Sequence, residues 1–375
     1  MVSAGTGSGG KRKKYTKTVK VKSDREAEKE LVKFVAKVKS STYIEPSKLT
    51  LKSFSEKWLI DYAKPKLAPK TIYEYERLLE LRIIPALGHL NLSKIKPIHL
   101  VEFYSNLQEE GIRIDGRGKK LSNNTILHYH RFIKNILETA VKWQLISSNP
   151  ANNVQPPKVK KKEADFYNEE EIKQLITCLE NEELKYKVAI LVTITAGLRL
   201  GELMGLKWNN VDFNTNTIEI VQANQYIPKN GVFSKDPKTE TSKRIISLPN
   251  PVIDILKQYK IEQTEKRLQC GDMWTDTEYI LTQWNGLPMH PNTPSTWFSK
   301  FLKKHELRKI TFHQLRHTSA TMLINAGLNI KALSARLGHS NTSTTLNIYS
   351  HALKSADKVA ADRIGDIIFK DKKIK

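Results

Sequence analysis

The segment Thr311-Phe312-His313-Gln314-Leu315-Arg316-His317-Thr318 carries the most information in the chain. It is followed by Leu337-Gly338-His339 and by Asn347-Ile348-Tyr349, so the whole cluster spans 38 residue steps (349 − 311). The cluster holds imidazoles, a guanidinium and a phenol. Phosphodiester transfer without a metal needs such groups: guanidinium groups neutralise phosphate oxygens, imidazoles move protons or donate hydrogen bonds, and a hydroxyl attacks phosphorus.

A second part of the pattern lies upstream. The segment Ala196-Gly197-Leu198-Arg199-Leu200-Gly201-Glu202-Leu203 supplies another arginine directly after an apolar run that is typical of a helix. Glu202 follows Arg199 by three residues, so a helix would place both side chains on one face. The carboxylate either holds the arginine in place or forms an ordinary surface ion pair.

The order Arg199, His313-x-x-Arg316, His339 and Tyr349 closely resembles the signature of the tyrosine recombinase (phage integrase) family. The resemblance implies that Tyr349 attacks the scissile phosphate, that Arg199 and Arg316 clamp its oxygens, and that His313 and His339 assist. His317 follows Arg316 directly, and we expect it to point elsewhere and to be structural.

The resemblance also suggests a general acid for the leaving 5′ oxygen. Lys238-Thr239-Glu240-Thr241-Ser242-Lys243-Arg244 is similar to the family's hairpin pattern of Lys-Thr followed by Ser and Arg, which points to Lys238. Lys235 and Lys243 lie close by and remain alternatives.

Composition narrows the class of partner. The 375 residues carry 62 Lys and Arg against 39 Asp and Glu, a formal charge of +23, which indicates a polyanion such as nucleic acid. Charge alone does not separate DNA from RNA or an anionic membrane surface. Two cysteines in so long a chain argue against a disulfide framework, and the scattered acids predict no metal site. The family chemistry implies no cofactor. No apolar run is long enough to span a bilayer, so we expect a cytoplasmic, DNA-associated bacterial protein without a membrane partner.

The spacing of apolar residues predicts a mainly α fold with a small β-sheet (α+β), in four parts. Residues 1–48 form a partial arm-type DNA-binding segment with a basic strand and a helix. In this segment the small polar residues 1–10 are interpreted as a turn or an irregular lead, and the strand is placed over 13–21. Residues 49–155 form a helical core-binding (SAM-like) domain in which Pro65 and Pro69 interrupt the helical pattern. Phe54, Trp58 and Tyr62 recur at helical spacing there, which predicts that the aromatic residues form the core. Residues 156–166 form a basic linker, and residues 167–375 a catalytic domain with a C-terminal tail, whose first helix we expect to be capped by Asn168 and Glu171.

Ten basic residues are candidates for contact with DNA phosphates. They are Lys11, Arg12, Lys13, Lys14, Lys17, Lys20, Lys158, Lys160, Lys161 and Lys162. For the N-terminal group a solvated basic tail is the alternative. In the helical domain we also expect an exposed basic face that includes His128 and His130.

The sequence therefore predicts a site-specific recombinase, an integrase of a mobile element from a phage or conjugative transposon. It would cut and rejoin double-stranded DNA at attachment sites through a 3′-phosphotyrosyl intermediate, without metal or ATP. The resemblance implies a homotetramer on DNA, with an excisionase and a DNA-bending protein as further partners. The apolar C-terminal stripe would pack on a neighbouring protomer or on its own domain. A catalytically silent DNA-binding regulator and a DNA-relaxing type IB topoisomerase are the alternatives.

Overall fold

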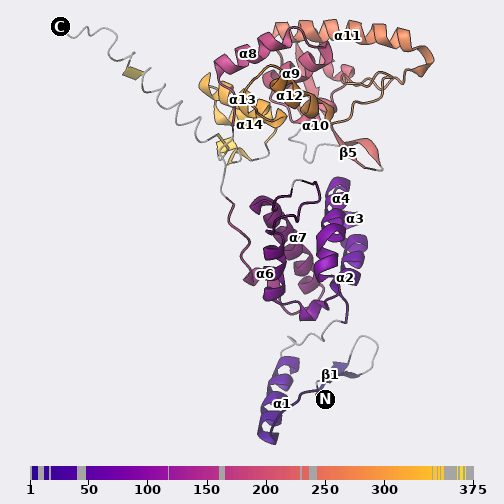
Figure 1. Ribbon diagram of the computed structural model, residues 1–375, viewed down its shortest axis with the longest axis vertical. Helices are drawn as coiled ribbons and strands as arrows, with labels where there is room; N and C mark the ends of the chain where they lie inside the picture. Colours follow the sequence, from indigo (N-terminus) through magenta and orange to yellow (C-terminus); the bar gives the residue numbers. More distant parts are fainter. Residues whose placement is uncertain are drawn as a thin grey trace, which may run out of the picture. The chain divides into compact units, whose positions relative to one another are not determined.

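The computed structural model divides into two compact units, Met1–Lys161 and Lys162–Lys375 (Figure 1). It describes residues 2–6, 12–16, 18–39, 48–116, 118–159, 165–228, 230–235, 243–339, 341–343, 345–346, 348–349, 361, 364–365 and 368. Helices dominate both units, which confirms the mainly α fold with a small sheet. Among the described residues, no helix has the length and apolar character needed to cross a membrane.

The N-terminal segment is a hairpin followed by a helix. Strand β1 (Val2–Thr6) pairs antiparallel with β2 (Arg12–Tyr15), and α1 spans Asp24–Lys39. The interpretation of residues 1–10 as an irregular lead is therefore wrong for residues 2–6. The basic strand also ends at Tyr15, earlier than expected. At the start of this helix the Glu26 amide donates to Ser23 Oγ, and the Glu26 carboxylate accepts from the Lys22 amide.

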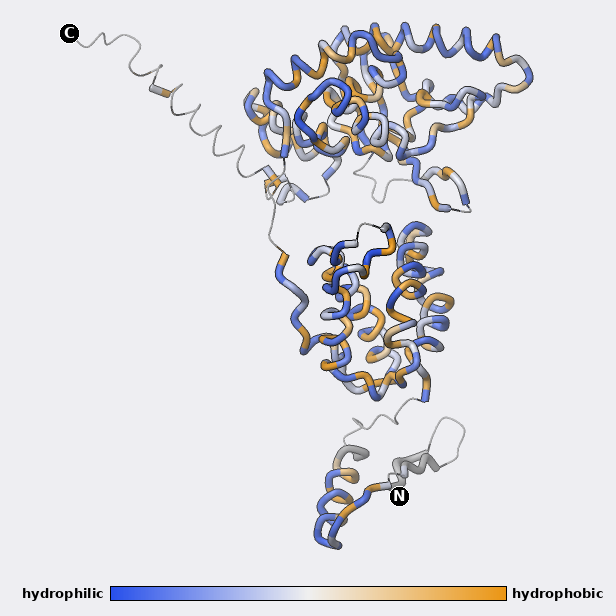
Figure 2. The backbone as a smooth tube through the Cα atoms, in the orientation of Figure 1, coloured by the Kyte–Doolittle hydropathy of each residue, from blue (hydrophilic) through white to orange (hydrophobic). Residues whose placement is uncertain are grey.

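The helical part of the first unit is built from α2 (Leu51–Trp58), α3 (Lys64–Lys66), α4 (Pro69–Leu78), α5 (Ile84–Leu87), α6 (Pro97–Asn106) and α7 (Asn123–Lys142). Short 3-10 turns cover Leu92–Lys94 and Pro150–Asn153. Two π-turns, Leu59–Ala63 and Leu79–Ile83, join α2 to α3 and α4 to α5. Figure 2 shows apolar and hydrophilic residues mixed along the helices of this unit, and the buried residues of α7 recur at helical spacing, as expected for a helix with one buried face.

Pro65 does not interrupt the helix, contrary to the prediction. Because proline has no N–H, the ordinary helical bond to the preceding turn cannot form there. The chain widens instead into the π-turn, in which the Lys64 amide donates to Leu59 O, and the helix continues to Lys66. Only Pro69, after the extended residues Leu67 and Ala68, starts a new helix.

The aromatic residues of this unit form its core, as their helical spacing predicts. Phe54 and Trp58 are fully buried, and Trp58 packs against Tyr62, Tyr75 and Phe132. The expectation that His130 is exposed is wrong, because it is buried beside Tyr104, whose hydroxyl lies 3.1 Å from His130 Nδ1. His130 is therefore part of the core and not of a DNA-facing surface.

The second unit places a small sheet beside a group of helices. Its helices are α8 (Glu169–Leu179), α9 (Leu184–Ala196), α10 (Leu200–Met204), α11 (Asn250–Cys270), α12 (Thr293–Lys304), α13 (Phe312–Asn325) and α14 (Ile330–Leu337), with 3-10 turns at Trp208–Asn210 and Gly271–Met273. The strands β3 (Val211–Asp212), β4 (Thr217–Ile220) and β7 (Arg244–Ser247) form one antiparallel sheet. Strands β5 (Ala223–Ile227) and β6 (Gly231–Lys235) form a separate hairpin.

The buried apolar residues show which elements form the core of the second unit. From Val188 to Ala196 helix α9 is almost entirely apolar and mostly buried, which places this part inside the helix group. Ile218 of β4 lies opposite Ile246 of β7, and both are buried against the same core. The capping box expected at the start of α8 is present: Asn168 and Glu171 exchange two hydrogen bonds of 2.8 Å.

Candidate active site

The end of α9 brings Arg199 into the candidate site. Gly197 closes the helix in the left-handed conformation (φ +66°), and a Cβ at this position would lie 2.7 Å from Leu337 Cδ2. Only glycine meets both conditions without strain. The chain then turns, and Arg199 stands at the start of α10 with its side chain partly exposed.

Glu202 is the carboxylate that holds this arginine. Its Oε1 accepts from Arg199 Nη1 at 2.7 Å, and its Oε2 accepts from the Arg199 amide at 3.0 Å. Arg244, at the first position of β7, donates to the same carboxylate at 2.8 Å and is itself almost completely buried. Burial alone would raise the pKa of Glu202, but the hydrogen bond and charge of Arg244, with the charge of Arg199, lower it below the ordinary value. The carboxylate is therefore ionised at neutral pH.

Arg316 lies at the centre of the cluster, with 2% of its surface exposed. Its Nη1 donates to Gly197 O and its Nη2 donates to Leu337 O, each at 2.7 Å. Both carbonyls belong to the ends of helices, where backbone oxygens lack helical partners. Burial and the neighbouring charge of Arg199 lower the pKa of Arg316 to about 10, which still leaves the guanidinium charged at neutral pH.

His339 joins the cluster through its two ring nitrogens. Arg316 Nη2 lies 2.9 Å from His339 Nε2, and a guanidinium can only donate, so Nε2 accepts. The proton of the neutral ring is then on Nδ1, which lies 2.8 Å from the hydroxyl of the buried Thr345. Burial, followed by the charge of Arg316, lowers the pKa of His339 to about 4, in agreement with a neutral ring.

Tyr349 is buried against α13 and α14, with 3% of its surface exposed. It packs with Ala320, Ile324, Leu333 and Leu337, and its hydroxyl lies 2.9 Å from His317 Nδ1. Burial raises the pKa of the phenol to about 12, although the charges of Arg316 and Arg199 oppose this shift. The phenol is therefore fully protonated at neutral pH.

The expectation that His317 points elsewhere is wrong, because it contacts Tyr349. His313 remains accessible to solvent on α13, and its ring stands edge-on to that of His317 with centroids 5.0 Å apart. Desolvation, then the charges of Arg316 and Arg199, lowers the pKa of His313. The spacing of His313 and His317, one helical turn, was the signal in the sequence that both rings share a face.

The structure brings Arg199, Glu202, His313, Arg316, His339 and Tyr349 into one region of the second unit, together with three residues that the sequence pattern did not assign to the site: Arg244, His317 and Thr345.

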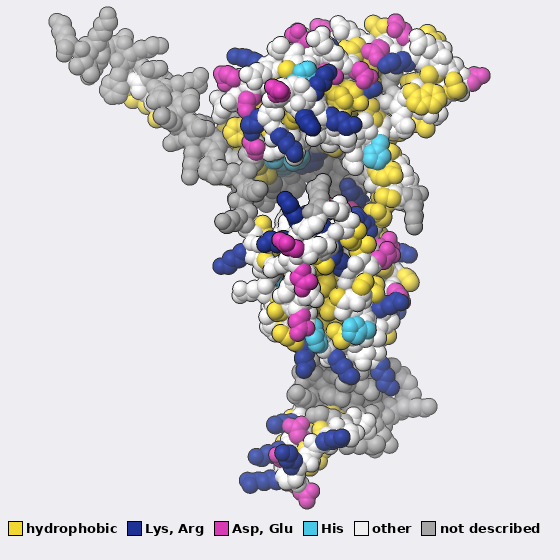
Figure 3. Space-filling model, in the orientation of Figure 1, with side chains coloured by type: hydrophobic (Ala, Val, Ile, Leu, Met, Phe, Trp, Pro, Cys, Tyr) yellow, Lys and Arg dark blue, Asp and Glu magenta, His cyan; other side chains and the backbone are white. Residues whose placement is uncertain are grey.

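Lys238 lies outside the described residues, as do Lys11, Lys17, Lys160, Lys161 and Lys162. Of the other candidate lysines, Lys20 and Lys158 are exposed, and Lys243, an alternative to Lys238, is exposed as well. Arg12, Lys13 and Lys14 lie on β2, and the alternative acid Lys235 ends β6. Figure 3 shows Lys and Arg side chains spread over both units.

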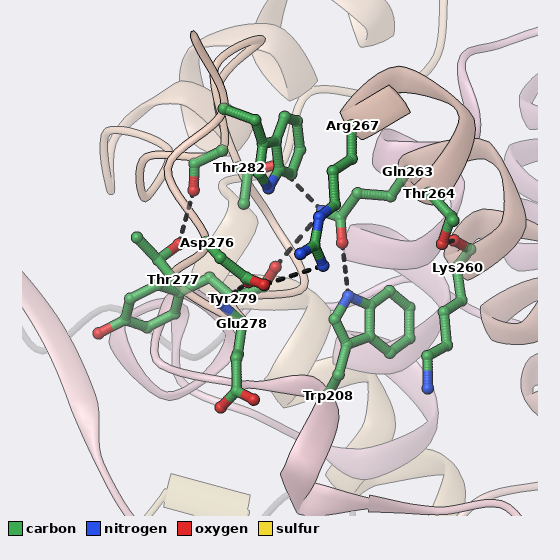
Figure 4. A pocket seen from close by; sticks show the side chains of 12 residues that line it. Trp208, Lys260, Gln263, Thr264, Arg267, Asp276, Thr277, Glu278, Tyr279 and Thr282 are labelled. Atoms are coloured by element: carbon green, nitrogen blue, oxygen red, sulfur yellow. Dashed lines mark hydrogen bonds and ion pairs between the residues drawn. The ribbon is translucent and has the colours of Figure 1, made fainter. Parts of the chain in front are cut away.

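A cavity of about 220 Å³ lies elsewhere in the second unit, and none of its lining residues belongs to this cluster. Figure 4 shows its polar groups paired with each other: Trp208 Nε1 donates to Gln263 Oε1, and Arg267 forms an ion pair of 2.9 Å with Asp276. The first contact ties α11 to the 3-10 turn at Trp208–Asn210 and the second ties it to the loop before α12, which is a structural role. Among the described residues, no group of three or more His, Cys, Asp or Glu side chains is arranged to hold a metal ion.

Comparison with known proteins identifies the family of the chain. Residues 165–356, which are 192 of the 375 residues, match the family model "Phage integrase family", and residues 50–108 match "Phage integrase, N-terminal SAM-like domain". The chain belongs to the phage integrase family of tyrosine recombinases. The resemblance drawn from the Arg, His-x-x-Arg, His and Tyr order is thereby confirmed.

Individual relatives extend over most of the chain. The tyrosine recombinase XerC-like protein of Caldanaerobacter subterraneus is 27% identical over 93% of this chain and 90% of its own. A tyrosine recombinase of Thermosipho africanus is 31% identical over 63% of this chain and 75% of its own. The ICEBs1 integrase of Bacillus subtilis is 27% identical over 74% of this chain and 73% of its own.

A solved structure shares the fold. The structure of the Tn1549 transposon integrase in complex with transposon right end DNA superimposes with a TM-score of 0.70, covering 84% of this chain and 99% of that one, at 23% identity.

Proposed function

We propose that this recombinase is the integrase of a mobile element, and that it cuts and rejoins duplex DNA at attachment sites through a 3′-phosphotyrosyl intermediate. The observation that carries the proposal is the convergence of Arg199, Arg316 and His339 from three distant segments. Arg316 contacts the carbonyls of Gly197 and Leu337, and Arg199 contacts that of Gly338, at 3.1 Å. Two fixed guanidinium groups match the oxygens of a phosphodiester.

In this mechanism each group has one task. Arg199 and Arg316 stabilise the charge that develops on the phosphate, and Tyr349 attacks phosphorus. The tyrosyl phosphodiester keeps the energy of the broken bond, so that a second DNA end can reverse the attack without ATP. His313 and His339 assist by proton transfer or hydrogen bonding, and Lys238 donates a proton to the leaving 5′ oxygen. Glu202 and Arg244 support Arg199.

Two permanent cations at the phosphate take the place that a metal ion has in many nucleases, and we therefore propose chemistry without metal or cofactor. We also propose that the protein acts as a homotetramer on DNA, assisted by an excisionase and a DNA-bending protein. The N-terminal segment and the lysines around 158–162 would contact DNA phosphates outside the cleavage site. Two relatives, the ICEBs1 integrase of Bacillus subtilis and the transposase from transposon Tn916 of Enterococcus faecalis, support a role in element mobility.

A suicide duplex, which loses a short fragment after cleavage and so traps the joint, tests the proposal. Wild-type protein should form a covalent DNA adduct in excess EDTA, while Tyr349→Phe should bind the duplex and form none. Cutting that EDTA abolishes and Mg²⁺ restores would favour a metal-dependent nuclease. Binding without any adduct from the wild-type protein would favour a silent regulator, and relaxation of supercoiled DNA without strand exchange would favour a topoisomerase.

A further inference from the structure

His317 makes a specific contact with the proposed nucleophile. Its Nδ1 lies 2.9 Å from the Tyr349 hydroxyl, and the two rings meet at 62° with centroids 5.6 Å apart. His317 comes from the middle of α13, whereas Tyr349 follows α14 in the chain. The hydrogen bond therefore ties the nucleophile to the helix that carries Arg316.

The two groups form a neutral pair. Burial keeps the phenol protonated, as described above, and burial with the charges of His313 and Arg316 lowers the pKa of His317 to about 4. A neutral phenol is a good donor and a neutral imidazole nitrogen a good acceptor, so the hydroxyl donates to Nδ1 and the ring proton is on Nε2. An imidazole that binds protons so weakly is a poor base for the phenol.

The Tyr349 hydroxyl is engaged inside the second unit. Tyr349 is 3% exposed, it belongs to the apolar cluster that also holds Ala320, Ile324, Leu333 and Leu337, and its hydroxyl forms the hydrogen bond to His317. In-line attack requires the reacting atoms to approach to about 3–3.5 Å. The hydrogen bond directs the phenolic proton toward His317 Nδ1, and because this imidazole is a poor base, the bond breaks when the oxygen turns to phosphorus.

We infer that His317 is a positioning residue that holds the Tyr349 hydroxyl in a resting orientation until DNA binds. The inference rests on the proposed role of Tyr349 as nucleophile. The hydrogen bond to His317 stabilises the resting state and is absent when the oxygen attacks, so it lowers the rate of attack. Removing the acceptor should raise that rate.

The experiment measures adduct formation in a single turnover on an attachment-site duplex with sulfur in place of the 5′-bridging oxygen. A thiolate leaves without a proton, so the rate reports the nucleophile and not the general acid. Four full-length proteins are compared with the wild type: His317→Leu, His317→Asn, His305→Leu and Tyr349→Phe. The asparagine variant keeps an acceptor near Nδ1. His305 is a half-buried histidine beside Glu182, so its leucine variant controls for loss of an imidazole.

His317→Leu should form the adduct faster than the wild type, by roughly two- to tenfold, which is the range expected for one hydrogen bond. His317→Asn should be slower than His317→Leu, and His305→Leu should match the wild type. An unchanged rate in His317→Leu overturns the inference. A slower rate in both His317 variants, with DNA affinity retained, also overturns it and makes His317 the proton acceptor for Tyr349. If the leucine variant fails to fold, His317→Ala is judged by the same criterion. Absence of any adduct from the wild type would instead reject the proposed function.

Discussion

Trp58 and Arg316 are among the largest side chains that the described part of the chain buries completely, and they represent two different kinds of core. Around Trp58 the neighbours are aromatic rings, and the one polar atom of the indole donates to Thr139 Oγ1 at 3.2 Å. Around Arg316 the neighbours are carbonyl oxygens, an imidazole and, at 4.0 Å, the carboxylate of Glu202.

The energetic meaning of the two residues differs accordingly. Burying an indole among rings is favourable by itself. Burying a guanidinium costs several kcal/mol before its partners offset the desolvation, so an apolar residue at this place would serve stability as well or better. We propose that Arg316 is kept for chemistry, with the backbone carbonyls at the ends of α9 and α14 holding it in a fixed orientation in advance of substrate. The core around Trp58 serves stability, and the one around Arg316 holds a preorganised charge.

Among the changes that test the contrast between these two cores, Arg316→Lys should have the largest effect. Lysine keeps the charge, but a single ammonium cannot donate to Gly197 O, Leu337 O and His339 at the same time. It also lacks the planar pair of N–H donors with which a guanidinium binds a phosphate. We expect adduct formation in a single turnover to fall by about a hundred- to a thousandfold, with DNA affinity nearly unchanged. A reduction of less than tenfold would mean that charge alone suffices and would weaken the contrast with Trp58.

The reciprocal change in the helical unit is Trp58→Leu. It removes the ring contacts and the bond to Thr139, so the free energy of unfolding should fall by about 2 kcal/mol in urea denaturation of the full chain. Below the transition, the folded variant should still form the adduct at a rate close to that of the wild type. A large decrease in catalysis by a fully folded variant would show that the two kinds of core are not separate in function.

Gly338→Ala tests the geometry around Arg316 on a finer scale. Gly338 has φ +64°, and a Cβ there would lie 2.7 Å from Arg244 Nη1. Gly327, with φ +87° and nothing within 4 Å of its Cβ position, is the matched control. Each alanine should cost about 1–2 kcal/mol of stability in thermal unfolding, because the left-handed conformation is unfavourable. Only Gly338→Ala should also slow adduct formation, and equal rates in the two variants would exclude Arg244 from the site.

The smallest effect concerns the N-terminal segment, which belongs to neither core. Deleting residues 1–45 removes seven basic side chains between Lys11 and Lys22. The log–log salt dependence of binding to full attachment DNA should flatten, by up to about 0.9 for each phosphate that is no longer neutralised. Binding to a short core duplex should change much less. An equal decrease in affinity for both duplexes would indicate a folding role, and an unchanged slope would indicate a solvated tail.

The sequence predicted the features that depend on local spacing. The glycine at the end of α9 and the capping box at Asn168 follow from short-range rules, and the aromatic core around Trp58 follows from helical periodicity. The family signature predicted which of the distant residues would meet. The catalytic roles assigned to them, and the four-part division of the chain, remain predictions.

The features that the sequence did not predict depend mostly on contacts between distant segments. Arg244 is one of many basic residues, and only the fold shows that it is buried against Glu202, 42 residues away. Because His317 follows Arg316 directly in a helix, the two side chains are expected to point in different directions. The direction of the His317 side chain follows instead from its spacing to His313, which is one helical turn away. Pro65 favours a helix end, but a π-turn avoids the missing N–H. The strand at residues 2–6 consists of small residues and one valine, so it lacks the clear alternation of large apolar and polar residues that predicts a strand.

The most direct test of the central claim is to identify the residue that carries the DNA. Wild-type protein is trapped on a suicide attachment-site duplex in EDTA, digested with nuclease and trypsin, and analysed by tandem mass spectrometry. We predict a nucleotide remnant linked through a 3′-phosphate to the peptide that contains Tyr349, with the modification on Tyr349 itself and none in Tyr349→Phe. A remnant on another residue, or an adduct of equal yield in Tyr349→Phe, would contradict the assignment of Tyr349 as the nucleophile.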